Sequence, residues 1–80
     1  MKYYEKFEIV NQTQEIQSDC NSLTIVNTGT AIAVLNGLNI APAAQYVILG
    51  NEQEINVSKY RLSFTGGGTE QVILIRKIFV

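Results

Sequence analysis

The loop GNEQEIN, from Gly50 to Asn56, carries the residues best suited to bind a cation. Asn51, Glu52 and Glu54 offer oxygen atoms, which are the ligands that Ca²⁺ prefers. An EF-hand loop places such ligands at alternate positions around a central glycine and ends on a bidentate glutamate, and this loop lacks that spacing. We therefore interpret it as a solvated turn, whose glutamates keep a sheet edge from pairing with other chains.

The composition gives little support to a catalytic centre. Cys20 is the only cysteine and the chain has no histidine, so a thiol nucleophile would lack its usual base. The carboxylates are scattered, whereas acid–base catalysis needs a pocket that shifts their pKa values. The run Gly66–Gly68 lacks the lysine of a phosphate-binding loop and precedes a predicted strand. We expect no enzyme, metal or cofactor, and interpret Cys20 as a small apolar filler or turn neighbour.

Size and charge restrict the remaining classes. The chain has 80 residues, enough for one small domain, and a net charge of −1. There is no basic stripe with interleaved aromatic residues, so we expect no nucleic-acid partner. No apolar run approaches the roughly 20 residues of a transmembrane helix, and the start does not resemble a signal peptide. We expect a soluble protein in a reducing compartment, since only one cysteine is present.

The elements that must position any site are predicted to be strands. Apolar residues are mostly β-branched or aromatic, and turn signals recur at short intervals. This pattern predicts a single all-β domain over residues 1–80, a small antiparallel β-sandwich or jelly-roll-like fold of about six or seven short strands. The segments are 3–10, 22–28, 31–36, 38–42, 44–50, 58–65 and 70–80. Residues 11–22 are interpreted as a polar connection with at most one extended or helical turn, and residues 1–21 as a candidate extended N-terminal arm.

Turn residues join these segments. Asn36-Gly37 is the strongest short signal for a hairpin, because a type I′ turn needs two residues that tolerate positive φ. A turn at Gly29 predicts a second hairpin, between the segments 22–28 and 31–36. Pro42 cannot donate to a sheet ladder, so it ends a strand or lies on a sheet edge.

The last strand is apolar on both faces. One face carries Val72, Leu74, Arg76, Ile78 and Val80, and the other carries Ile73, Ile75, Lys77 and Phe79. Such a strand is normally central in a sheet that is covered on both faces. Residues 46–49 are also apolar on both sides, so they too need cover on both faces. So small a domain either leaves these residues partly exposed or buries them against another subunit. We favour the second reading and predict an interface formed by Tyr46, Ile48, Ile73, Ile75 and Phe79.

The tyrosines allow an alternative function. Aromatic rings form platforms for sugars, and the candidates here are Tyr3, Tyr4, Phe7, Tyr46 and Tyr60. The same residues also suit half-buried positions of a sheet. The alternative prediction is a small glycan- or ligand-binding module that uses these rings and the loop at Glu52 and Glu54.

From Leu23 to the end, the order of turns and strands resembles the small β-rich virion proteins of tailed phages of Bacteroidota, crAss-like phages included. The shared features are an Asn-x-Gly turn, an Asn-Gly turn, a proline corner, a Gly-Asn-Glu-x-Glu-Ile loop and an Ile-Arg-Lys strand. In this sequence they are Asn27 and Gly29, Asn36 and Gly37, Ile40 and Pro42, Gly50 to Ile55, and Ile75 to Lys77. The family pattern has glycine after the proline, whereas this chain has Ala43, which argues against a positive-φ turn there.

The resemblance implies a virion structural protein, either a capsid auxiliary or decoration protein or part of a head fibre, with no catalytic residues and no cofactor. Its expected partners are further copies of itself and other virion proteins such as the major capsid protein. Its expected location is the capsid, assembled in the host cytoplasm. An alternative prediction is a β domain from a larger cellular assembly. Only the neighbouring genes would distinguish such a domain from a virion protein.

Overall fold

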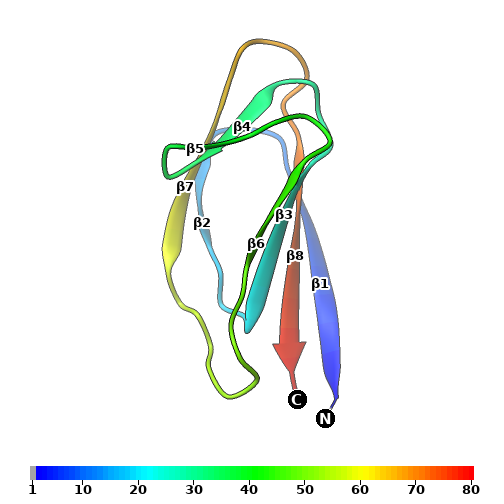
Figure 1. The fold of residues 1–80 in the computed structure, drawn as a ribbon, viewed down its shortest axis with the longest axis vertical. Coiled ribbons are helices and arrows are strands. Elements are labelled where there is room, and N and C mark those ends of the chain that lie inside the picture. The colour runs from blue at the N-terminus through cyan, green and yellow to red at the C-terminus, as the bar shows by residue number, and fades with distance from the viewer. Residues whose placement is uncertain (1) are drawn as a thin grey trace.

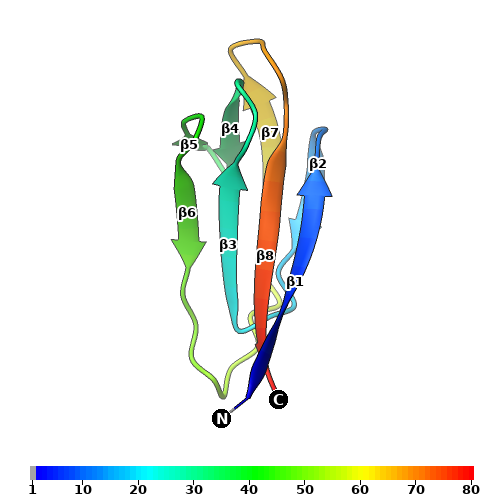
Figure 2. The ribbon, with the colours of Figure 1, turned by 90° about the vertical axis from the view of Figure 1, so that its right-hand side faces the viewer.

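Residues 2–80, which the computed structural model describes, form eight strands and no helix. The strands make two four-stranded antiparallel sheets that face each other, as Figure 1 shows edge-on and Figure 2 face-on. The first sheet has the order β1-β8-β3-β6, with β1 at Tyr3–Val10, β8 at Val72–Phe79, β3 at Ser22–Asn27 and β6 at Gln45–Ile48. The second has the order β2-β7-β4-β5, with β2 at Gln14–Gln17, β7 at Lys59–Thr65, β4 at Ile32–Leu35 and β5 at Leu38–Ile40. The all-β prediction is confirmed, and the strands number eight rather than six or seven.

The additional strand is β2, within the segment interpreted as a connection. Gln14–Gln17 pairs with β7, and Ile16 is buried opposite Tyr60. One aliphatic residue among polar ones gives almost no periodic signal, so the sequence did not reveal this strand. The start of the chain is also in the sandwich, because every residue of β1 has a partner in β8.

The core lies between the sheets and follows the alternation of each strand. Side chains alternate across a strand, so the buried members identify the inner face. The last strand is central, as expected, and its Val72 and Leu74 belong to the buried core. The buried core consists of Val10, Ile16, Cys20, Leu23, Ile25, Ala33, Leu35, Ile40, Leu62, Val72 and Leu74.

Of the two predicted hairpins, one is confirmed and one is wrong. Asn36 and Gly37 have φ values of 48° and 87° and join β4 to β5 in a tight hairpin. The segments around Gly29 do not pair, because β3 belongs to the first sheet and β4 to the second. Buried Asn27 stabilises this crossing: its side-chain amide donates to the Ala31 carbonyl at 2.8 Å and the Ile40 carbonyl at 2.9 Å.

The corner at Pro42 is a type II β-turn over residues 41–44. The Ala44 amide donates to the Ala41 carbonyl at 3.0 Å, Pro42 occupies the second position, and Ala43 has φ of 68°. Glycine favours this third position, because positive φ costs an L-residue steric energy. The sequence argued against a positive-φ turn at Ala43, and that expectation is wrong: the chain makes the turn with alanine.

Candidate functional site: the outer face of the first sheet

The outer face of the first sheet is broadly apolar. Phe7 of β1 lies opposite Ile75 of β8, which lies opposite Thr24 of β3, and Val47 of β6 completes this row. The next row joins Ile9, Ile73 and Val26. Phe7 and Ile9 are 66% and 64% exposed, far above what core aromatic and aliphatic side chains show. We call this surface the apolar face; Figure 2 looks directly onto its strands. Its apolar members are Tyr3, Phe7, Ile9, Val26, Val47, Ile73, Ile75 and Phe79.

The outer face of the second sheet is different in character. Alternation from the buried Ile16 and Leu62 places charged and polar side chains outward along β2 and β7. These are Glu15, Gln17, Lys59, Arg61, Ser63 and Thr65, with an ion pair between Lys59 and Glu15 at 3.9 Å. The outer face of the second sheet therefore has the composition of a solvent-exposed sheet surface, whereas the outer face of the first sheet does not.

One end of the apolar face carries a cation among aromatic rings. The Tyr3 and Phe79 rings meet edge-to-face with centroids 5.8 Å apart. The Lys77 ammonium lies 4.2 Å from the Tyr3 centroid and 5.2 Å from that of Phe79. This geometry favours the cation electrostatically and holds both rings in place on the sheet surface.

The five predicted interface residues do not share a face. Ile73, Ile75 and Phe79 lie together on the apolar face, next to Phe7 and Ile9 of β1. Tyr46 and Ile48 point to the inner side, opposite Ile25 and Leu23, and line a hollow between the sheets. Phe7 and Ile9 are not among the predicted interface residues, although their alternation with Lys6 and Glu8 along the strand indicated an apolar side.

The hollow beside Tyr46 brings two of the candidate sugar-binding rings together. Its lining consists of Leu35, Asn36, Leu38, Tyr46, Ile48 and Tyr60. Tyr46 is 41% exposed, and the Tyr60 hydroxyl accepts a hydrogen bond from the Asn56 amide at 3.0 Å. Tyr3, Tyr4 and Phe7 are all on β1, so the five aromatic residues do not form one platform.

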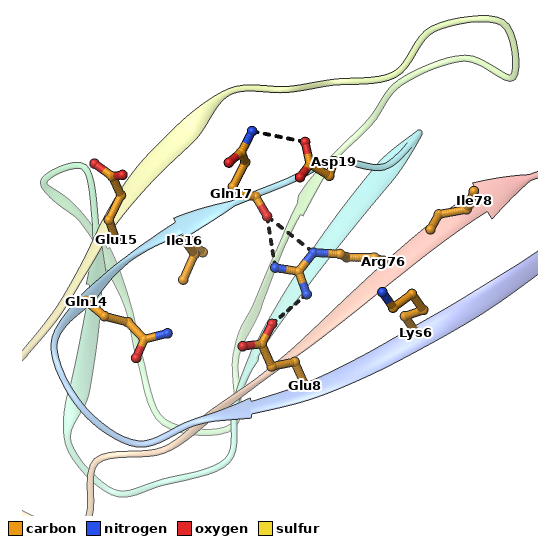
Figure 3. A pocket seen from close by; sticks show the side chains of 9 residues that line it. All are labelled: Lys6, Glu8, Gln14, Glu15, Ile16, Gln17, Asp19, Arg76 and Ile78. Atoms are coloured by element: carbon orange, nitrogen blue, oxygen red, sulfur yellow. Dashed lines mark hydrogen bonds and ion pairs between the residues drawn. The ribbon is translucent and has the colours of Figure 1, made fainter.

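A second opening lies between β1, β8 and β2 and is polar (Figure 3). Arg76 reaches across it from β8, and its side chain is 14% exposed. Its guanidinium donates to the Ser18 carbonyl at 2.9 Å, to the Gln17 carbonyl at 2.9 Å and to the Glu8 carboxylate at 2.7 Å. All three guanidinium nitrogens donate to protein acceptors, and because Gln17 belongs to β2 and Arg76 to β8, the arginine links the two sheets. Lys6 and Glu8 of β1 also face this opening.

The loop with Asn51, Glu52 and Glu54 is organised by its own hydrogen bonds. The Asn51 side-chain amide donates to the Glu54 carboxylate, and the Asn51 side-chain oxygen accepts from the Gln53 backbone amide at 3.0 Å. Buried Asn21 donates to the Asn51 and Glu54 carbonyls at 3.1 and 2.7 Å. Within residues 2–80, no three acidic, cysteine or histidine side chains gather as a metal site would require.

Cys20 lies in the core and forms an isolated antiparallel bridge with Asn56. Burial raises the pKa of its thiol above the ordinary value of 9.0, against the opposing effect of the Arg76 charge. A raised pKa keeps the thiol protonated at neutral pH, where only the thiolate is a good nucleophile.

Among the described residues, no helix has the length and apolarity needed to cross a membrane. Comparisons with protein-family models, with curated proteins and with solved structures gave no match.

Proposed function

We propose that this chain is a non-enzymatic virion structural protein of a tailed phage, a capsid auxiliary or decoration protein present in many copies on the head. The single observation that carries the assembly role is the apolar face, which exposes Phe7 and Ile9 beside Ile73 and Ile75, whereas β2 and β7 present charged and polar side chains on the opposite outer face. Large exposed apolar patches on small soluble domains mark surfaces that bind other proteins. The phage context rests on the resemblance of residues 23–80 to virion proteins.

The proposed surface consists of Ile73, Ile75 and Phe79 with Phe7 and Ile9 around them. Its partners are further copies of the chain and other virion proteins such as the major capsid protein. A domain of 80 residues has a thin core, so binding to a shell would add stability by mass action. The capsid, assembled in the host cytoplasm, is the proposed location.

The test is the solution mass over a dilution series, measured by light scattering after size exclusion, together with occupancy on capsids. Ile75→Lys introduces a charge at the centre of the apolar face and should give a folded protein that no longer associates through this face. Val34→Lys is the matched control, because Val34 is also half-buried but lies on the outer face of the second sheet. An Ile75→Lys protein with unchanged mass and capsid occupancy would contradict the proposal.

The hollow beside Tyr46 supports a second candidate function, a glycan-binding module. Tyr46 and Tyr60 line the same hollow together with Asn36, which combines ring surface with a polar residue. Glu52 does not line it, and Glu54 lines a separate hollow with Asn21 and Ile55. Glycan-array binding by the wild type that Tyr46→Ala abolishes without unfolding the domain would favour this candidate over the first.

A further inference from the structure

The first sheet ends in an unusually long free edge. β1 has eight residues, while the other edge strands among residues 2–80, β2, β5 and β6, have four, three and four. Natural sheets protect their edges with short strands, prolines or bulges, because an unpaired edge is a template for another strand. β1 contains neither proline nor glycine and pairs with β8 without interruption from Tyr3 to Val10.

The backbone groups available at this edge follow from the pairing with β8. The Val80 amide donates to the Lys2 carbonyl at 2.9 Å, which makes the even-numbered residues of β1 the hydrogen-bonded partners of β8. Because hydrogen-bonded and non-hydrogen-bonded pairs alternate, the odd-numbered residues Tyr3, Glu5, Phe7 and Ile9 direct their amides and carbonyls away from β8. These same four residues have their side chains on the apolar face.

We propose that a second copy of this chain pairs with β1 along this edge, antiparallel and centred on Phe7, which joins two first sheets into one continuous sheet. This inference rests on the proposed assembly function and names its partner. A two-fold axis at Phe7 places Phe7 opposite Phe7 of the second copy, in a hydrogen-bonded pair. The two apolar faces then become one surface that extends across the axis.

Charge selects this register. Lys6 and Glu8 point to the inner side of β1, where Figure 3 shows both facing the opening. With the axis at Phe7, each Lys6 lies opposite Glu8 of the second copy, so two cross-strand ion pairs form. A shift of two residues in one direction places Lys6 opposite Lys6, and in the other direction Glu8 opposite Glu8. Like charges directly opposite destabilise a sheet, so both neighbouring registers are disfavoured.

Inward-pointing charges on an edge strand normally block pairing with another strand. Here Lys6 and Glu8 have opposite charges and are two residues apart, so each can lie opposite the other in a two-fold pairing. The Glu8 carboxylate keeps Arg76 at 2.7 Å, and its side chain is still 46% exposed. It can therefore accept from a lysine of the second copy without losing the arginine. The pairing is two-fold and closes on itself, whereas pairing of β1 with another edge would build open polymers.

Site-specific cross-linking tests the register. In a Cys20→Ala background, Phe7→Cys should form a disulfide-linked dimer under mild oxidation, because the two α-carbons would be about 5.5 Å apart. Glu5→Cys alone should not cross-link, since its two copies would be about 13 Å apart along the strand. A mixture of Glu5→Cys and Ile9→Cys proteins should cross-link, because those residues lie opposite each other.

A charge reversal tests the ion pairs. Lys6→Glu should weaken dimerisation roughly five- to tenfold, because it replaces two attractive cross-strand pairs with two repulsive ones. Lys2→Glu makes the same change in net charge outside the proposed ion pairs and should leave the dissociation constant unchanged. Equal weakening by both variants would mean that net charge alone acts, which would overturn the register.

The outcomes separate this inference from the proposed function. If the Cys20→Ala parent associates but Phe7→Cys does not cross-link, or Glu5→Cys cross-links equally well, the edge pairing is wrong and assembly through the apolar face stands. If the parent is a monomer at every concentration and none of the cysteine variants cross-links, the edge pairing fails and self-association loses its support. Growth of mass without limit would replace the two-fold dimer with an open polymer.

Discussion

At the scale of single residues, Ala43 shows how a turn overrides a residue preference. Its positive φ is required by the type II turn that returns the chain from β5 to β6. The hydrogen bonds on either side of the turn, from Ala43 to the Asn27 carbonyl and from Asn27 to the Ala44 carbonyl, hold the corner against β3. The fold therefore imposes a conformation that alanine adopts at an energetic cost.

Ala43→Gly should stabilise the protein by about 0.5–1 kcal/mol. Relief of the left-handed conformation gains about 1–2 kcal/mol, and the extra backbone entropy of the unfolded chain cancels part of it. Ala41→Gly, two residues earlier, provides the control and should destabilise by a few tenths of a kcal/mol, because Ala41 has no positive φ to relieve. Urea denaturation of both variants measures the difference, and a lower midpoint for Ala43→Gly would contradict the prediction.

Cys20 gives a prediction for alkaline pH. Burial raises its pKa above 9.0 in the folded state, while the thiol regains its ordinary pKa in the unfolded chain. The contribution to stability is thus complete below the ordinary pKa and is lost as pH rises from there toward the raised folded-state value. In that window the wild type should lose up to about 1.4 kcal/mol per pH unit relative to Cys20→Ala.

The comparison with Cys20→Ala isolates the thiol, because the two proteins differ in no other ionisable group. Denaturant unfolding between pH 7 and pH 10 provides the measurement. Parallel curves for the two proteins over this range would show that the thiol ionises equally easily in both states, against the prediction.

At the scale of elements, two asparagines and one arginine fix loops that the sequence left undefined. Asn27 closes the crossing between the sheets, Asn21 holds the loop at Asn51 and Glu54, and Arg76 fastens the residues after β2 to β8. The alternation of 58–65 and 70–80 was sufficient to predict β7 and β8 and their faces. It was not sufficient for β2, whose four residues are held by pairing with β7 rather than by their own pattern.

The same limit explains the incorrect hairpin at Gly29. A short turn between two apolar segments predicts pairing of those segments, but it cannot show that the chain changes sheets there. The crossing depends on Asn27 being buried with both amide hydrogens and its oxygen satisfied, the oxygen by the Gly29 amide at 3.0 Å. Such a partner set is formed by tertiary structure, so local sequence patterns do not contain it.

Arg76→Met should destabilise the protein by about 2–4 kcal/mol. The substitution keeps much of the apolar stem but removes the donors to the Gln17 and Ser18 carbonyls and the pair with Glu8. Hydrogen bonds from charged donors contribute about 1.5–3 kcal/mol each, reduced here by partial exposure. Arg61→Met is the control on the exposed side of β7 and should change stability by less than about 0.5 kcal/mol. Thermal unfolding of both variants tests the difference, and equal effects would refute the role of Arg76 as a link between sheets.

At the scale of the whole molecule, the outer faces of the two sheets were predicted from the sequence only in part. Apolarity on both sides of residues 70–80 correctly indicated a central strand, and the cover of its outer face by another subunit stays a prediction. It did not show that β1, rather than β6, supplies the neighbouring exposed residues Phe7 and Ile9, because strand order depends on pairings distant in sequence. Tyr46 and Ile48 were assigned to the same surface for their composition, and the register of β6 places them on the inner side instead.

An interface on the apolar face should make thermal stability depend on protein concentration. Association only of folded chains stabilises them by mass action. For a dimer, a hundredfold rise in concentration above the dissociation constant adds about 1.4 kcal/mol per protomer, which corresponds to roughly 5–10 °C in Tm for a domain of this size. Differential scanning calorimetry over two decades of concentration provides the measurement.

The variants identify which surface produces the dependence. Ile75→Lys should show a weaker dependence of Tm on concentration than the wild type, because a charge at the centre of the apolar face prevents association through that face while the core between the sheets is intact and the β1 edge is unchanged. Val34→Lys should retain the wild-type dependence, since its surface is outside the interface. A wild-type Tm that does not change with concentration would mean that the apolar face is not used between copies. The exposed Phe7 and Ile9 would then have to be covered by a different protein, and the capsid is the partner to test next.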